Sequence, residues 1–166
     1  KITLIPEKCR PLDEVISSIH GADIIVMGPG SLYTSVIPNL LVPGVIDAIK
    51  KSNAKKVYIP NVMTQPGETE GYNVLDHVEA LIKHTEPGLI DCIIANDEKI
   101  PESVSKRYKE DGSTQVLLDN EQRLKLKCMG IRTIESNLIE VKNAYIRHNA
   151  NEISSIIVKL ALGHDI

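Results

Sequence analysis

Short apolar runs alternate with amphipathic stretches along this chain of 166 residues. Runs such as ADIIVM at 22–27 and DCIIA at 91–95 are typical of strands buried on both faces of a sheet. The stretches between them space their apolar residues three or four positions apart, which indicates helices with one face against a core. This alternation predicts βαβ units in an α/β fold. We expect one domain over residues 1–166, with three layers α/β/α and a mostly parallel sheet.

Caps and breaks define the ends of the expected elements. Pro38 is expected to halt a short helical turn, because proline has no backbone N–H to donate. Asp119 and Asn149 stand where capping side chains begin two later helices. The expected strands are residues 1–5, 22–27, 55–59, 91–95 and 115–119. The expected helices are residues 11–21, 43–52, 74–82, 101–108, 119–130 and 149–161.

Composition narrows the class of protein. Hydrophobic residues make up 42% and charged residues 25%, which is ordinary for a globular chain and excludes disorder. The net charge of -3 offers no positive footprint for nucleic acid or an anionic membrane. Cys9, Cys92 and Cys128 are odd in number and include no C-x-x-C pair, which favours free thiols in a reducing cytoplasm. We therefore expect a cytoplasmic protein that has no membrane span and binds no nucleic acid.

The first candidate site follows the strand expected at 22–27. Ligands of parallel sheets commonly lie beyond the carboxyl ends of the strands. Glycines let a ligand approach the backbone, and hydroxyls together with the N–H groups of a helix start suit a phosphate. The segment is neither G-x-G-x-x-G nor a Walker loop, and a tight turn that merely needs glycine is the alternative. The candidate ligand-binding residues are Gly28, Pro29, Gly30, Ser31, Tyr33, Thr34 and Ser35.

The second candidate site follows the strand expected at 55–59. Amide, hydroxyl and carboxylate side chains surround a Pro-Gly turn there, and they could bind sugar hydroxyls or the edge of a base. A plain surface turn is the alternative. Glu68 is the natural general base if the site has one, although a lone carboxylate does not establish that role. The candidate residues are Asn61, Thr64, Gln65, Glu68 and Thr69.

A third candidate site precedes the last expected helix. Arg147 and His148 stand just before its N-terminus, where cations oppose the helix dipole unless an anion is bound by both. The alternative is that Arg147 pairs with a carboxylate such as Glu140 or Asp97. Tyr108 is a further candidate, either as a ring that stacks on a ligand or as a half-buried core residue.

The histidines do not form a recognisable metal-binding set. Asp76 and His77 are expected on the exposed side of the helix at 74–82, and His84 follows two turns later on the same face. That spacing is too long for one ion, and the sequence has no H-x-x-x-H motif or Cys/His cluster. We expect no metal site. Solvent exposure is the common outcome for such a first turn, and a position facing the ligand site is the alternative.

Two long segments resemble a known family. ADIIVMGPGSLYTSVIPNLLVPG and KKVYIPNVMTQPGETEGYNVLDHVEALIKH are similar to the CofD-like family in its bacterial gluconeogenesis-factor branch, and DCIIAN and IRHNA match the same branch. Members begin with a glycine-rich nucleotide-type loop after their first strand, and this chain lacks one. It therefore looks like the C-terminal half of a longer protein. The resemblance implies a Rossmann-like fold in a cytoplasmic protein.

The same resemblance implies a function. It points to a regulator that binds UDP-sugars, notably UDP-N-acetylglucosamine, and that acts in cell shape and envelope synthesis on gluconeogenic carbon sources. Tyr108 and Arg147 would contact the uridine diphosphate, and a homo-oligomer and a protein of envelope synthesis are the expected partners. The family's other branch transfers 2-phospholactate to a deazaflavin precursor with Mg²⁺. Its GPSNP-like loop differs from the Gly-Ser-Leu-Tyr that follows Gly28-Pro29 here, so the transferase is the alternative and no catalytic residue is assigned.

Overall fold

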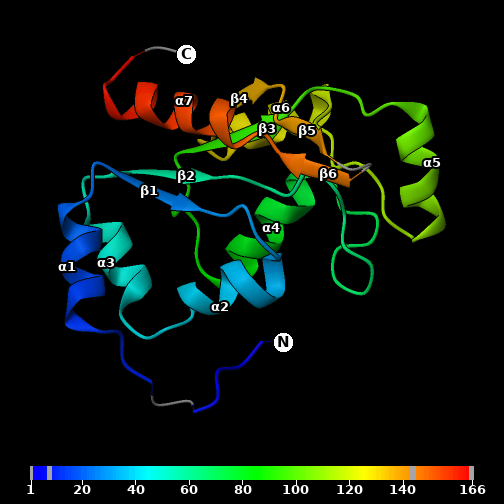
Figure 1. Ribbon diagram of the computed structural model, residues 1–166. Helices are drawn as coiled ribbons and strands as arrows, with labels where there is room; N and C mark the ends of the chain where they lie inside the picture. The colour runs from blue at the N-terminus through cyan, green and yellow to red at the C-terminus, as the bar shows by residue number, and fades with distance from the viewer. Residues whose placement is uncertain (1, 7–8, 143–144, 165–166) are drawn as a thin grey trace.

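The computed structural model describes residues 2–6, 9–142 and 145–164 (Figure 1). Four parallel strands form the central sheet in the order β1-β2-β3-β4, and β5 pairs with β6 in an antiparallel hairpin. The strands are β1 (Ile24–Met27), β2 (Lys55–Tyr58), β3 (Cys92–Asn96), β4 (Arg132–Ser136), β5 (Ile139–Lys142) and β6 (Tyr145–His148). The helical segments are α1 (Asp13–Gly21), the π-helical turn η1 (Leu32–Val36), α2 (Ile37–Leu40), α3 (Val45–Lys51), α4 (Val74–His84), α5 (Glu102–Glu110), α6 (Asn120–Cys128) and α7 (Ala150–Ala161).

Helices cover both faces of the central sheet (Figure 1). Helices α1, α3, α4 and α6 pack on one face, and α7 with the β5–β6 hairpin packs on the other. Neighbouring strand residues point to opposite faces, so Tyr58 and Ile93 join the first core while Val57 and Ile94 join the second. The expected three-layer α/β/α fold with a parallel sheet is confirmed.

Side-chain caps define where three helices begin. The Asn73 side chain accepts a hydrogen bond from the Asp76 N–H at 3.0 Å, and the Asp76 carboxylate accepts one from the Asn73 N–H at 2.8 Å. This reciprocal capping box satisfies two N–H groups at the start of α4. Asp119 accepts from the Gln122 N–H at 2.8 Å at the start of α6, and Asn149 caps α7 in the same way. The caps expected at Asp119 and Asn149 are confirmed.

Two expected strands are not formed. Residues 2–5 have no strand, and Ile5 is 94% exposed, because no strand of the described chain lies beside them to complete a ladder. Lys1, the first residue of that prediction, lies outside the described residues. The strand expected at 115–119 is reduced to one antiparallel bridge between Gln115 and Met63. The place beside β3 is taken by β4, and Val116 and Leu118 are buried without joining the sheet.

The prediction that Pro38 halts a helix is also wrong. Pro38 lies in the first turn of α2, where the fixed φ of proline suits the start of a helix. The helical segment therefore continues from Leu32 to Leu40 through η1 and α2. Strands β4, β5 and β6 were not predicted from the sequence. The sequence of β4, RTIES, has Ile134 as its single apolar residue, so the strand lacks the continuous apolar run that marks β3.

The three cysteines differ in how far they are exposed. Cys9, Cys92 and Cys128 are all free, and Cys92 is buried in β3 while Cys128 is exposed.

In the residues that the structure describes, no single helix has the length and hydropathy to cross a membrane. The segments Leu32–Leu40 and Val45–Lys51 meet that test only when taken together, and they are bent by 72°.

Candidate functional site

A crevice of about 620 Å³ lies beyond the carboxyl ends of β1 and β2. Its walls come from the segments that follow these strands, from the end of α5 with the loop after it, and from β6. Ligands of parallel sheets bind at this edge, and the volume is ordinary for a small-molecule pocket. The lining residues are Pro29, Gly30, Ser31, Asn61, Val62, Met63, Thr64, Gln65, Pro66, Tyr108, Asp111, Ser113, Ile146, Arg147 and His148.

Gly28 brings the segment after β1 against the end of β2. Its φ is +82°, and a Cβ there would lie 2.6 Å from the carbonyl oxygen of Ile59. The Ile59 N–H donates to the Met27 carbonyl at 2.9 Å, so the two strands stay paired at this point. Only glycine combines this backbone angle with so close an approach. Gly28 therefore forms the tight turn that was the alternative prediction for this segment, and the residues directly after it line the crevice.

Ser31 joins the two strand-end segments through hydroxyl and carboxylate groups. Its hydroxyl donates to the Glu68 carboxylate and accepts from the Thr34 hydroxyl at 2.6 Å. The Thr34 oxygen also lies 3.4 Å from the other Glu68 oxygen. Glu68 is therefore within hydrogen-bond reach of a crevice hydroxyl, which is the geometric requirement for a general base. The Glu68 carboxylate also places a negative charge next to Ser31, on the side of the crevice where a phosphate was expected.

The segment after β2 is held rigidly by the loop that follows α5. The Thr64 N–H donates to the Thr114 carbonyl at 2.8 Å, and the Thr64 hydroxyl accepts from the Thr114 N–H at 2.8 Å. The Ser113 hydroxyl donates to the Thr64 carbonyl at 2.5 Å. The Asn61 amide donates to the Gln65 side-chain oxygen at 3.1 Å. This bond leaves the Asn61 oxygen and the Gln65 amide hydrogens able to bind a ligand, whereas Thr64 is buried and already bonded.

Tyr108 and His148 close the wall formed by β6. The Tyr108 hydroxyl accepts from the Ile146 N–H at 2.8 Å, so this half-buried ring is fixed where it lines the crevice. His148 Nε2 lies 3.4 Å from the Pro60 carbonyl oxygen. Burial lowers the pKa of His148, and the contact with the Pro60 carbonyl opposes that shift only in part. At neutral pH this imidazole is uncharged.

Arg147 supplies the positive charge of this wall. It lies opposite Glu140 in the pairing of β5 with β6, but it forms no ion pair with Glu140, Asp97 or any other residue in the described ranges. Its side chain is exposed at the crevice. The expectation that an anion meets two cations here needs correction, because His148 is neutral at neutral pH. Of Arg147 and His148, only Arg147 carries a permanent positive charge.

Six of the predicted site residues do not line the crevice. Gly28, Thr34 and Glu68 support it from behind, and Ser35 faces a smaller cavity of about 300 Å³. Thr69 is fully buried, and its hydroxyl accepts from the Gln65 N–H at 2.9 Å. Tyr33 points elsewhere, with its hydroxyl 2.7 Å from that of Tyr72. Burial is the main reason that the pKa of Tyr33 is raised to about 12, and the hydrogen bond with Tyr72 is the second.

Several residues that the fold brings to the crevice were not predicted from the sequence. The loop after α5 is polar and follows a helix end, and this signal could have identified its members. The hairpin strand β6 gave no comparable signal, because its apolar positions are few. The missed lining residues are Val62, Met63, Pro66, Asp111, Ser113 and Ile146.

His77 lies in the core, and its expected exposure is wrong. The ring is fully buried and edge-on to Tyr72, with 5.5 Å between the ring centroids. Nδ1 lies 2.8 Å from the Asn73 carbonyl oxygen, and Nε2 has no partner among the described residues. The described ranges contain no group of three or more His, Cys, Asp or Glu side chains that could hold a metal.

Comparison with known proteins gives one consistent result. The family model described as 2-phospho-L-lactate transferase CofD matches residues 1–139. A gluconeogenesis factor of Bacillus subtilis (strain 168) is 46% identical over 160 residues, which cover 96% of this chain and 50% of that protein. A gluconeogenesis factor of Halalkalibacterium halodurans is 44% identical over 159 residues, which cover 96% of this chain and 48% of that protein.

A solved structure agrees with these sequence matches. The crystal structure of a Bacillus halodurans protein aligns with a TM-score of 0.89 and 44% identity. The alignment covers 94% of this chain and 49% of the other. The chain thus spans about half the length of the curated relatives it matches.

Proposed function

The chain belongs to the CofD family, and from this premise we propose that its crevice binds a UDP-sugar, UDP-N-acetylglucosamine first of all. The observation that carries the proposal is that nine predicted ligand-binding residues, from four separate segments, line this one crevice. In our proposal the chain is the ligand-responsive part of a cytoplasmic gluconeogenesis factor. It would couple the supply of nucleotide sugar to cell shape and envelope synthesis on gluconeogenic carbon sources.

The chemistry of the lining suits both parts of such a ligand. Arg147 provides charge-assisted hydrogen bonds for a diphosphate, and the ring of Tyr108 provides a flat surface for a base. Asn61, Gln65 and Ser31 provide amide and hydroxyl groups for sugar hydroxyls. An uncharged His148 can bind a polar group without adding a second charge.

The position of Glu68 suggests which way the ligand lies. Its carboxylate accepts from Ser31 on the β1 side of the crevice, so a phosphate there would approach a negative charge. Arg147 lies on the β6 side, where a diphosphate would be stabilised. We therefore orient the diphosphate toward Arg147 and the sugar hydroxyls toward Ser31 and Glu68.

Isothermal titration of UDP-N-acetylglucosamine tests the proposal, with UDP-glucose and GDP for comparison. The titration should be made with this chain and with a longer protein that contains it. Arg147→Ala should weaken UDP-N-acetylglucosamine binding by about 1.5–3 kcal/mol, the cost of a lost charge-assisted hydrogen bond. Glu68→Gln tests the orientation, since it should reduce the preference for UDP-N-acetylglucosamine over UDP while UDP itself binds as before.

The matched control is Arg132→Ala, which removes an exposed arginine that does not line the crevice. This variant should keep the wild-type affinity. Equal binding by wild type and Arg147→Ala would contradict the role of Arg147. Absence of UDP-sugar binding in both chain lengths would reject the proposed function.

The transferase is a second candidate, favoured by the description of the matching family model. It predicts a product only when Mg²⁺, a 2-phospholactate donor and a deazaflavin precursor are all present. Mass spectrometry of such a mixture, with each component omitted in turn, tests it. Glu68, within reach of the Ser31 hydroxyl, is the residue whose substitution by glutamine should then lower the rate.

A further inference from the structure

Asp111 lines the crevice with a carboxylate that has no part in the contacts described so far. The side chain is exposed, and it forms no hydrogen bond or ion pair with any residue that the structure describes. Asp111 also caps the C-terminal end of α5, where a negative charge opposes the helix dipole. The carboxylate therefore lowers the stability of this helix end, and no contact within the described chain compensates for it.

The loop after α5 holds Asp111 in a fixed position. The Asp111 N–H donates to the Tyr108 carbonyl at 3.1 Å, and the Ser113 N–H donates to the same oxygen at 2.8 Å. Gly112, between them, has a φ of +75°, so the chain turns sharply here. Ser113 is buried, and its hydroxyl donates to the Thr64 carbonyl in the opposite wall. Asp111 is thus held on a tight turn beside Tyr108.

The chemistry of a carboxylate restricts which part of a nucleotide sugar it can bind. An ionised carboxylate only accepts hydrogen bonds, so the ligand must supply the donors. A phosphate supplies none and is repelled by the charge. The ribose has two neighbouring hydroxyls, which can donate one bond to each carboxylate oxygen. Rossmann-type dinucleotide sites use an Asp or Glu in this way for the ribose.

The neighbours of Asp111 agree with a ribose at this place. In the proposed function, Tyr108 provides a surface for the base and Arg147 provides the charge for the diphosphate. The Tyr108 hydroxyl accepts from the Ile146 N–H at 2.8 Å, and Ile146 directly precedes Arg147 in β6, so the two subsites adjoin. The ribose joins the base to the diphosphate. It would therefore lie beside Tyr108, on the side that faces Arg147.

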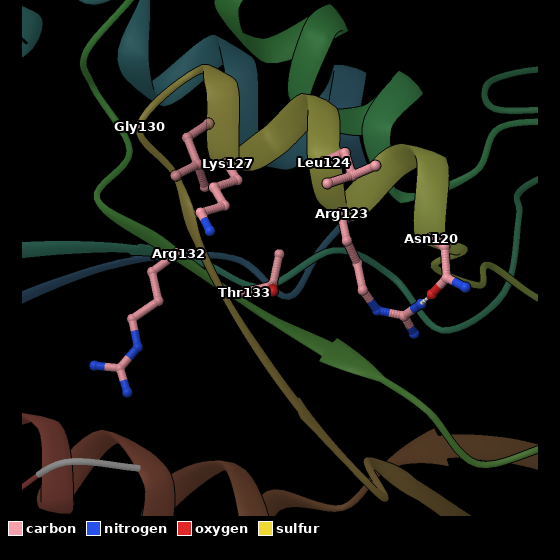
Figure 2. A pocket seen from close by; sticks show the side chains of 8 residues that line it. Asn120, Arg123, Leu124, Lys127, Gly130, Arg132 and Thr133 are labelled. Atoms are coloured by element: carbon pink, nitrogen blue, oxygen red, sulfur yellow. Dashed lines mark hydrogen bonds between the residues drawn. The ribbon is translucent and has the colours of Figure 1, made fainter.

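Another large cavity of the molecule lacks these groups (Figure 2). It measures about 730 Å³ and lies between α6 and β4, at the edge of the sheet away from β1, and none of the described residues that line it is aromatic or acidic. Figure 2 shows the Arg123 guanidinium turned toward Asn120, to which it donates at 2.7 Å, and Arg123 is also paired with Glu135. A ligand that needs a ring and a carboxylate is therefore expected in the crevice.

We propose that Asp111 accepts hydrogen bonds from the 2′- and 3′-hydroxyls of the ribose and makes the crevice selective for ribonucleotides. This role rests on the proposed UDP-sugar function and adds the ribose to the parts of the ligand that the crevice recognises. A 2′-deoxyribose leaves one carboxylate oxygen without its donor, so such a ligand binds more weakly.

Titration of the wild-type protein with UDP and with 2′-deoxy-UDP tests the hydroxyl contact without any substitution. Neither ligand carries the second sugar, so the ribose is compared alone. We expect UDP to bind about tenfold more tightly, as a charge-assisted hydrogen bond would give. Equal affinities would overturn the role of Asp111 and leave the UDP-sugar function in place. Absence of binding of UDP and of UDP-N-acetylglucosamine would reject the function, and the role of Asp111 with it.

Asp111→Ala removes the proposed acceptor. In this variant the affinities for UDP and 2′-deoxy-UDP should lie within about twofold of each other, because the hydroxyl no longer has a charged partner. The matched control is Glu110→Ala, which removes the same charge from the preceding exposed residue, outside the crevice lining. This control should keep the tenfold preference. A tenfold preference retained in Asp111→Ala would overturn the proposal.

The same titrations in Mg²⁺ and in a chelator test a divalent cation as the group that the carboxylate binds. The preference for UDP over 2′-deoxy-UDP should be the same in both solutions. UDP binding that requires Mg²⁺ in the wild type, and no longer requires it in Asp111→Ala, would show that Asp111 holds a cation. That result would overturn the contact with the ribose.

Discussion

His77 illustrates how burial sets the charge state of a single side chain. Its ring lies in the core with Nδ1 against the Asn73 carbonyl, so the neutral form with a proton on Nδ1 satisfies that contact. Nε2 meets no hydrogen-bond partner among the described residues, and a second proton there would place a charge in apolar surroundings. Burial accordingly lowers the pKa of His77, with smaller opposing effects from Asn73 and Asp76.

This lowered pKa predicts a pH-dependent stability. A histidine of the unfolded chain titrates near 6.5, so below about that pH the unfolded state binds more protons than the folded state. The free energy of unfolding should therefore fall as the pH drops from about 7.5 to about 5.5. His148, whose pKa is also lowered, contributes in the same direction. In urea titrations at these two values, His77→Phe should show a smaller fall than wild type.

The control for this prediction is His20→Gln, which removes an exposed histidine in the last turn of α1. Its free energy of unfolding should keep the wild-type dependence on pH. An NMR titration of the His77 ring in the wild-type protein gives an independent measurement. A fall in stability that is equal in His77→Phe and wild type would show that His77 is not a source of the effect.

Between elements, the contact of β1 with β2 depends on one glycine. Gly28→Ala would bring a Cβ against the Ile59 carbonyl and keep a residue with a side chain at a φ of +82°. The backbone strain costs about 1–3 kcal/mol, and the steric clash adds to it. Gly67→Ala is the matched control, because Gly67 has a φ of +80° with nothing within 4 Å of the added Cβ. Urea unfolding should show a larger loss for Gly28→Ala, and equal losses would contradict the contact.

The sequence predicted the elements whose signal is local. Strands β1 to β3 carry apolar runs, and the caps at Asp119 and Asn149 act within four residues, so both were visible in the pattern. The strand expected at 115–119 failed because strand formation depends on which partner is available. Val116 and Leu118 are buried, but β4 occupies the position beside β3 in the sheet. Local pattern does not show such competition for a sheet edge.

The predictions of the candidate site divide in the same way: local features were predicted, and contacts between distant segments were not. The segments after β1 and β2 were identified because a parallel fold brings strand ends to one edge. Contacts between distant segments were not predictable, such as those of Thr64 with Ser113 and Thr114. The position of Tyr33 away from the crevice was not predictable for the same reason, because its hydroxyl bonds to that of Tyr72, which is distant in the sequence.

At the scale of the whole molecule, the crevice joins segments from both ends of the chain. A ligand that contacts residues 29–31 and 146–148 together binds the folded state and not the unfolded chain. UDP-N-acetylglucosamine at about one hundred times its Kd should therefore raise the free energy of unfolding by about 2.7 kcal/mol. Thermal denaturation with and without the ligand measures this, as a single shifted transition.

The stabilisation should fall to about 0.3–1.3 kcal/mol in Arg147→Ala at the same ligand concentration and keep its full value in Arg132→Ala. An unchanged melting temperature for the wild type at saturating ligand would contradict binding to the folded state. A shift in only part of a biphasic transition would show that the ligand stabilises one part of the chain alone.

The order in which the crevice walls occur along the chain has a consequence for the protein during its synthesis. The walls at residues 29–31, 61–66 and 108–113 are translated before the wall that carries Arg147. A growing chain can pair β1 with β2 early, yet it has no complete crevice until β6 has left the ribosome. Capture of the nucleotide sugar would then be restricted to chains whose translation has passed this point, so nascent chains would not compete for the ligand.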